Sequence, residues 1–116
     1  MADAVAYKIL TSEQMTVLEH DKSFAGAPVD LADGYIHLSA ADQLQGTLDK
    51  HFAGQQGLWL VAVDLDAIAE QIKWEESRGG ALFPHLYGEL PLAAVLRVDP
   101  LPLNAAGMHV FPSPPF

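Results

Sequence analysis

An uninterrupted apolar run at residues 58–63 constrains the fold of this chain more than any other feature. It reads Leu-Trp-Leu-Val-Ala-Val. A strand with one face in water alternates apolar and polar side chains, whereas a continuous apolar run is typical of a strand in the middle of a sheet. Residues 6–10, 72–75 and 93–98 also have strand composition. The sequence therefore predicts a sheet in which residues 58–63 form an interior strand.

Helix-start signals lie between these predicted strands. Thr11 and Gln14 have capping-box spacing, and Ser39 with Asp42 resembles a second capping box. Gly54 is expected to end the second helix. The apolar face expected for that helix consists of Ala41, Leu44, Leu48 and Phe52. Together with the strands, these signals predict an α+β fold with two to three helices.

We expect a single domain over residues 1–116. This length lies in the usual single-domain range of roughly 100–150 residues, and the 50% hydrophobic content suffices for one core. Residues 21–34 are rich in Gly, Pro, Asp and Ala, so we expect an irregular loop that presents the next segment. Residues 99–116 are expected to form a Pro-rich tail.

The charge and composition of the chain argue against several classes of function. Six Lys and Arg residues against 15 Asp and Glu give a formal net charge of −9, so extended nucleic-acid binding is not expected. No apolar run approaches the roughly 18 residues of a membrane span, and no secretory signal is evident. We therefore expect a cytoplasmic protein that does not associate with membranes. Without cysteine, neither disulfides nor thiolate chemistry is available.

Residues 34–39, Gly-Tyr-Ile-His-Leu-Ser, carry the most distinctive chemistry. In a strand, His37 points away from its apolar neighbours, and Tyr35 and Ser39 share its face. A phenol, an imidazole and a hydroxyl on one face suit a sugar or an amide, because they offer both donors and acceptors. The alternative is a structural histidine that caps the preceding loop.

Residues 74–80 combine an aromatic ring, two carboxylates and a cation beside two glycines. Trp74 with a neighbouring carboxylate suits a catalytic loop. Adjacent side chains of a strand point to opposite sides, so at most one of Glu75 and Glu76 is expected to face a pocket. Arg78 either binds a ligand phosphate or pairs with a glutamate at the surface.

Residues 83–89 repeat the alternation, with His85 and Tyr87 on one face and Glu89 as a further candidate for it. Two histidine rows from different parts of the chain suggest a shared cleft for a small molecule, although a half-exposed strand gives the same pattern. The spacing of His37, His85 and a glutamate gives no support for a metal site, so none is expected.

Several segments together resemble the bacterial family called domain of unknown function 952, over about residues 5–98. They are Tyr7-Lys8-Ile9, the stretch from Asp33 to Ser39 with Ala41-Asp42-Gln43, His51-Phe52, Trp74-Glu75, and the stretch from Phe83 to Gly88. The resemblance implies a fold similar to the ADP-ribosyltransferase superfamily, whose small α+β domains contain a split, bent antiparallel sheet with a nicotinamide-nucleotide cleft.

The stretch Ile-His-Leu-Ser also looks like the His-Leu-Ser stretch of RNA 2′-phosphotransferases, members of that superfamily. This analogy implies that His37 and Ser39 hold the nicotinamide ribose and that Tyr87 stacks on the nicotinamide. RNA phosphate removal is nevertheless not expected, because those enzymes use several arginines and this chain has only Arg78 and Arg97.

The resemblance implies that a late glutamate orients the attacking group, and Glu75, Glu76 and Glu89 compete for this role. We take His37 and Glu75 as the catalytic candidates. The ligand-binding candidates are Tyr35, Ser39, Trp74, Arg78, His85 and Tyr87. With these residues, the resemblance implies a transferase-like enzyme that binds NAD or a smaller nucleotide, with the cofactor and the oligomeric state otherwise open.

Two alternatives to this enzyme remain open. The first is a non-catalytic module that recognises a small metabolite or a protein partner in the same cleft. In the second, the histidine rows are structural, and the protein acts through an apolar oligomer surface such as the tail that ends at Phe116.

Overall fold

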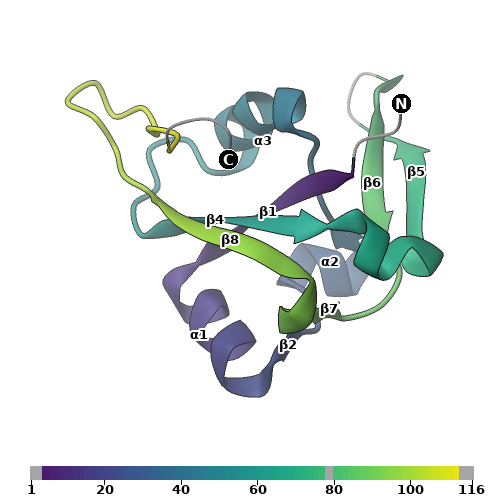
Figure 1. Cartoon of the computed structure of the whole chain (residues 1–116). Helices are drawn as coiled ribbons and strands as arrows, with labels where there is room; N and C mark the ends of the chain where they lie inside the picture. Colours follow the sequence, from purple (N-terminus) through teal and green to yellow (C-terminus); the bar gives the residue numbers. More distant parts are fainter. Residues whose placement is uncertain (1–3, 78–79, 113–116) are drawn as a thin grey trace.

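The apolar run at residues 58–63 forms the middle strand of a three-stranded antiparallel sheet. The computed structural model describes residues 4–77 and 80–112. In the sheet, β4 (Leu58–Asp64) lies between β1 (Val5–Thr11) and β8 (Val95–Leu101), as Figure 1 shows. Most of β4 is buried, including adjacent residues that point to opposite faces. The predicted interior position of this strand is therefore confirmed.

A second antiparallel sheet carries the segments around the two histidine rows. Its strand order is β3-β6-β5, where β3 is Ile36–His37, β6 is Leu82–Leu86 and β5 is Ile72–Glu76. Figure 1 shows β5 and β6 as a hairpin beyond the end of β4. A separate two-stranded sheet joins β2 (Ser23–Phe24) to β7 (Leu90–Pro91).

The chain that leaves β3 attaches the second sheet to the first. Tyr7 of β1 and Ser39 exchange two backbone hydrogen bonds, with N···O distances of 2.8 and 2.9 Å. The backbone N–H of Leu38 donates to the carbonyl of Pro84 in β6. These bonds fix the position of β3 between the central sheet and the hairpin.

Three α-helices are seen in the described part of the chain: α1 (Ser12–Asp21), α2 (Pro28–Asp33) and α3 (Leu44–His51). Short 3-10 segments cover Ala41–Gln43, Leu65–Gln71 and Leu92–Ala94. The predicted capping box at the start of α1 is confirmed, because the Thr11 hydroxyl accepts from Gln14 N–H and the Gln14 side chain accepts from Thr11 N–H. No helix among these residues is long and apolar enough to cross a bilayer.

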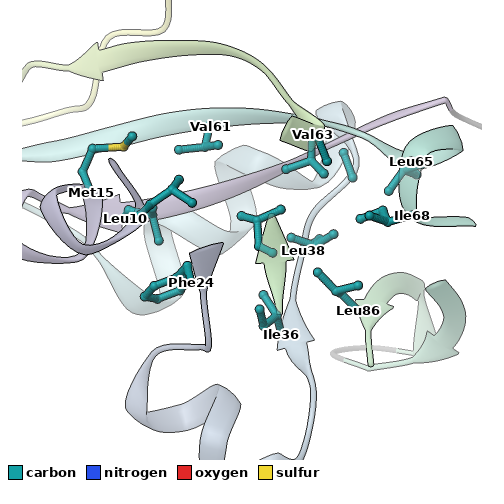
Figure 2. Close-up of a cluster of buried hydrophobic side chains, with 14 residues drawn as sticks. Leu10, Met15, Phe24, Ile36, Leu38, Val61, Val63, Leu65, Ile68 and Leu86 are labelled. Carbon is teal, nitrogen blue, oxygen red and sulfur yellow. The ribbon is translucent and has the colours of Figure 1, made fainter. Parts of the chain in front are cut away.

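Two apolar clusters cover the two faces of the central sheet, because side chains of a strand alternate. Ala6 and Leu10 of β1 belong to the first cluster, which Figure 2 shows, whereas Tyr7 and Ile9 belong to the second. Lys8 shares the face of Ala6 and Leu10, so its side chain starts on the side of the first cluster. The first cluster includes Met15, Leu18, Phe24, Ile36, Leu38 and Leu86, and the second includes Leu44 and Leu48 of α3.

The prediction of an irregular loop over residues 21–34 is wrong. This segment contains β2 and the six-residue helix α2, which begins at Pro28, where the missing N–H costs nothing. Gly34 has φ of 90°, a left-handed conformation that glycine adopts readily, and it ends α2.

The predicted start and end of the next helix also need correction. The side chain of Gln43, not that of Asp42, caps the start, because its Oε1 accepts from Ala40 N–H. Helix α3 ends at His51, before the predicted stop at Gly54. The closing strand β8 begins two residues later than expected and extends to Leu101, within the segment predicted as a tail.

Candidate functional site

The two predicted histidine rows lie on one face of the second sheet. His37 of β3 and His85 of β6 are direct antiparallel partners, so their side chains project from the same face. The neighbouring pair, Ile36 and Leu86, projects from the opposite face into the apolar core (Figure 2). One face of the sheet is thereby tied to the core, and the other is available for polar groups.

Four rings pack together on this polar face. The Tyr35 ring stacks on His85, with centroids 4.1 Å apart and planes inclined by 22°. The same ring lies 4.7 Å from His37 and 5.2 Å from Tyr87, and the two imidazoles are 5.6 Å apart. Tyr35 is therefore the centre of the cluster, and we call these four residues the ring cluster.

A buried carboxylate holds one nitrogen of His37. Asp30 of α2 has a fully buried side chain, and its Oδ1 lies 2.6 Å from His37 Nδ1. The backbone N–H of His37 donates to the same oxygen, and Ala27 N–H donates to Oδ2. Behind Asp30, the ammonium of Lys8 lies 2.9 Å from Oδ2. The side chains of β1, α2 and β3 thus meet at one carboxylate.

Burial and charge act in opposite directions on the Lys8–Asp30 pair. Burial by itself raises the pKa of Asp30, but the Lys8 ammonium and the hydrogen bonds from His37, Lys8 and Ala27 outweigh it and place this pKa below its ordinary value. Burial lowers the pKa of Lys8, and Asp30 opposes that effect. A buried pair of this kind is stable only while both charges are present.

The other nitrogen of His37 faces a second carboxylate. His37 Nε2 lies 3.0 Å from Asp33 Oδ2, and the His37 side chain is 30% exposed. Asp33 is the last residue of α2 and is itself well exposed. The outward edge of the imidazole is consequently the part of this ring that a ligand can reach.

Glu75 of β5 binds the other half of the ring cluster. Its Oε1 accepts from the Tyr87 hydroxyl at 2.6 Å and lies 2.9 Å from His85 Nδ1. These hydrogen bonds from Tyr87 and His85 lower the pKa of Glu75 below its ordinary value, at which the carboxylate is already ionised at neutral pH. The hydrogen bond that Tyr87 donates to Glu75 is also the main reason that the pKa of Tyr87 rises to about 12.

His85 is the most buried member of the ring cluster, with a side chain that is 2% exposed. Its Nε2 atom is buried and has no hydrogen-bond partner among the described residues. Nearby, the ammonium of Lys73 lies 4.8 Å from the centre of the exposed Tyr87 ring, a cation–π contact. The ring cluster therefore offers aromatic faces and one buried imidazole nitrogen without a partner among the described residues, and the Lys73 ammonium lies beside it.

Comparison with known proteins assigns the chain to a family. Residues 9–98 match the model described as Protein of unknown function (DUF952). The chain belongs to the DUF952 family. A crystal structure of protein CC0527 from Caulobacter crescentus matches with 46% identity and a TM-score of 0.86, covering 91% of this chain and 93% of that one. Its solution NMR structure matches with 46% identity, a TM-score of 0.81 and coverage of 91% of both chains. Among curated proteins no significant match is found.

The other predicted ligand-binding residues of this DUF952 chain lie away from the ring cluster or outside the described residues. The Ser39 hydroxyl is 2.9 Å from Thr47 Oγ1 of α3. Trp74 is paired with Pro84 and, by alternation with Glu75, projects from the opposite face of β5. Arg78 lies outside the described residues.

The structure also separates the three competing glutamates. Glu75 faces the ring cluster, and Glu76, as the next residue of β5, projects from the other side. Glu89 does not join the row of His85 and Tyr87, because its carboxylate accepts a hydrogen bond from the Ser23 hydroxyl.

Surface recesses are present away from the ring cluster. Two recesses of about 460 and 430 Å³ are both lined in part by Asp42; one also includes Phe83 and the other Tyr7. They are bordered by apolar groups and exposed charges, and lack the histidine–carboxylate pairs. We place the candidate site at the ring cluster because convergent polar groups, rather than volume, carry chemistry.

Sequence reasoning missed Asp30 and Lys8. Asp30 fell within the segment interpreted as a loop, and its contact with Lys8 joins residues 22 positions apart. One signal was available, because Lys8 interrupts an otherwise apolar strand at a position that alternation directs into the core. A charge there requires a buried partner.

Proposed function

We propose that this DUF952 chain binds a nucleotide at the ring cluster, with NAD as the first candidate, and transfers the ADP-ribose part to an acceptor. The observation that carries the proposal is the carboxylate of Glu75. It is held by His85 and Tyr87, it is partly exposed, and it lies on the same face of the sheet as His37.

The chemistry of nicotinamide departure explains why such a carboxylate matters. Breaking the bond between nicotinamide and ribose leaves positive charge on the sugar, and an ionised carboxylate beside it stabilises that charge. Glu75 is ionised at neutral pH, as an ordinary carboxyl is, and the hydrogen bonds from Tyr87 and His85 lower its pKa further. The exposed ring of Tyr87 offers a face for the departing base, and the outward nitrogen of His37 offers a hydrogen bond to a ribose hydroxyl.

The arrangement of the sheets supports the same proposal. Two three-stranded antiparallel sheets joined through Tyr7 and Ser39 fit the split sheet implied by the resemblance to the ADP-ribosyltransferase superfamily. Ser39 itself is not assigned to the ligand, because its hydroxyl contacts Thr47.

Calorimetric titration with NAD and ADP-ribose tests binding, and chromatography of released nicotinamide tests turnover. We expect binding tighter than about 1 mM and a slow release of nicotinamide. Glu75→Gln should retain binding and reduce the release rate about tenfold or more, whereas Glu76→Gln is the matched control and should behave as wild type. The proposal would be refuted if neither NAD nor ADP-ribose bound to the chain below about millimolar concentration.

A second candidate is a non-catalytic module that binds a small metabolite at the same cluster. It is favoured by one observation: Glu75 Oε1 is already engaged by both His85 and Tyr87. Two results together would favour this module over the transferase. The wild-type chain would bind the nucleotide without releasing nicotinamide, and His37→Ala would abolish the binding.

A further inference from the structure

We infer that Asp30, supported by Lys8, is a positioning residue that holds the proton of His37 on Nδ1 and presents Nε2 to the ligand. The assignment rests on the proposed function only in placing a ligand at the outward edge of His37. The orientation of the ring itself follows from contacts within the chain.

Asp30 receives hydrogen bonds from groups on every side of its carboxylate. Two come from His37, through Nδ1 at 2.6 Å and the backbone N–H at 3.1 Å, and both reach Oδ1. Oδ2 accepts from Ala27 N–H at 2.8 Å and faces the Lys8 ammonium at 2.9 Å. Because the backbone and the ring of His37 bind the same oxygen, the imidazole cannot rotate without losing one of these bonds.

The direction of the proton follows from the chemistry of the partners. An ionised carboxylate has no proton to donate, so a hydrogen bond between Asp30 and Nδ1 requires the proton on the ring. Lys8 contributes by keeping Asp30 ionised in spite of burial. With Nδ1 protonated, Nε2 of a neutral His37 ring carries the lone pair, which makes it the hydrogen-bond acceptor or the general base.

Stability alone gives a weak reason for this arrangement. Buried ion pairs contribute little net stability, and apolar side chains of similar volume often replace them without loss. Lys8 lies on the side of β1 that faces an apolar cluster, where Leu or Met would fit that environment better. The pair does supply a carboxylate whose position and charge are fixed beneath a half-exposed imidazole.

Asp33 occupies the place of the ligand atom in this arrangement. Its Oδ2 lies 3.0 Å from Nε2, and an ionised carboxylate can only accept a hydrogen bond, so this contact requires a proton on Nε2 as well. The Asp33 side chain is 46% exposed and can move away at small cost, and Nε2 of the neutral ring then offers its lone pair. A ribose hydroxyl is the group that fits there, because it can donate to the lone pair of Nε2 and also accept from a protonated ring.

The test is the protonation of His37 measured by nitrogen NMR of the histidine rings, in the chain labelled with ¹⁵N and without any ligand. We expect the neutral His37 ring to carry its proton on Nδ1, and the Asp33→Asn variant, which alters the outward side, to keep it there. In Lys8→Met/Asp30→Leu, which removes both buried charges together, the proton should move to Nε2 in a large fraction of the molecules.

A neutral wild-type ring protonated on Nε2 would overturn the inference, as would an unchanged Nδ1 proton in the folded double variant. If the double variant does not fold, the wild-type and Asp33→Asn spectra still decide the outcome. A purely structural role for Asp30 would not move the tautomer. Because no nucleotide is present, failure here is distinguishable from failure of the proposed NAD site.

Discussion

Two carboxylate–histidine pairs lie on one face of the second sheet, and they are built in opposite ways. In the first, Asp30 is fully buried and His37 is 30% exposed. In the second, His85 is 2% exposed and Glu75 is 39% exposed. The accessible member is therefore an imidazole in one pair and a carboxylate in the other.

The difference explains why a lysine is buried beside one pair alone. A buried carboxylate needs a compensating charge, which Lys8 supplies to Asp30. Glu75 keeps its charge at the surface, where hydrogen bonds from His85 and Tyr87 are sufficient. Under the proposed function, the two pairs supply a base, His37, and an anion, Glu75, from one face of the sheet.

Among the substitutions in the two pairs, Asp30→Asn should have the largest effect on the free energy of unfolding. This substitution leaves the Lys8 ammonium buried without a carboxylate, and we expect the free energy of unfolding to fall by about 3–5 kcal/mol. Glu75→Gln should cost clearly less, because Glu75 is exposed to solvent. Urea unfolding of both variants measures the difference.

The control for this prediction is Lys8→Met/Asp30→Asn, which removes both buried charges and should recover most of the lost stability. The comparison between the two pairs fails if Asp30→Asn is no more destabilising than Glu75→Gln. It also fails if the double variant is as unstable as Asp30→Asn alone.

The two pairs should differ less in how they respond to acidic pH than in how their substitutions change the free energy of unfolding. The pKa values of Asp30 and Glu75 are both lowered in the folded chain, so each stabilises it above the unfolded value of roughly 4 and loses that contribution as the pH falls through the folded pKa. The free energy of unfolding should therefore decrease on acidification. Urea unfolding at a series of acidic pH values measures this decrease.

The variants assign the acid response to each pair. Lys8→Met/Asp30→Asn should flatten the pH dependence more than Glu75→Gln, because the Asp30 carboxylate is buried and that of Glu75 is screened by solvent. Equal pH dependence in wild type and the double variant would show that Asp30 is not preferentially ionised by the fold.

Local sequence signals predicted the parts of the fold that depend on neighbouring residues. The apolar run at 58–63 and the Thr11–Gln14 capping box are both present in the structure. The short elements within residues 21–34 were missed because six and two residues are too few to show a period. The strand at Phe24 forms only by pairing with Leu90, which lies far away in the sequence.

Part of the candidate site likewise follows from local sequence, and part depends on contacts between distant residues. Alternation correctly placed His85 and Tyr87 on one face, since both contact Glu75. Asp30 could not be connected to His37 from the sequence, because that contact depends on where α2 packs against β3. The sequence favoured Glu75 but could not set aside Glu89, because the hydrogen bond to the Glu89 carboxylate comes from Ser23, which lies 66 positions earlier in the chain.

The smallest expected effect is a change in the pKa of Tyr87 when the exposed carboxylate of Glu75 is removed. The hydrogen bond to Glu75 raises the pKa of Tyr87 to about 12, so Glu75→Gln should lower it toward the ordinary value of roughly 10. The ultraviolet absorbance of tyrosinate, followed during alkaline titration, measures the change. Glu76→Gln, on the other side of β5, should leave the curve unaltered.

The same substitution at Glu75 should also change how stability depends on alkaline pH. A tyrosine whose pKa is raised in the folded chain stabilises the fold below about pH 10, and this contribution is lost as the pH rises through the folded pKa. Glu75→Gln should therefore weaken the loss of stability at alkaline pH. An identical titration curve in wild type and Glu75→Gln would mean that the hydrogen bond between Tyr87 and Glu75 does not form in solution. The exposed carboxylate of the second pair would then not be held in place as the comparison requires.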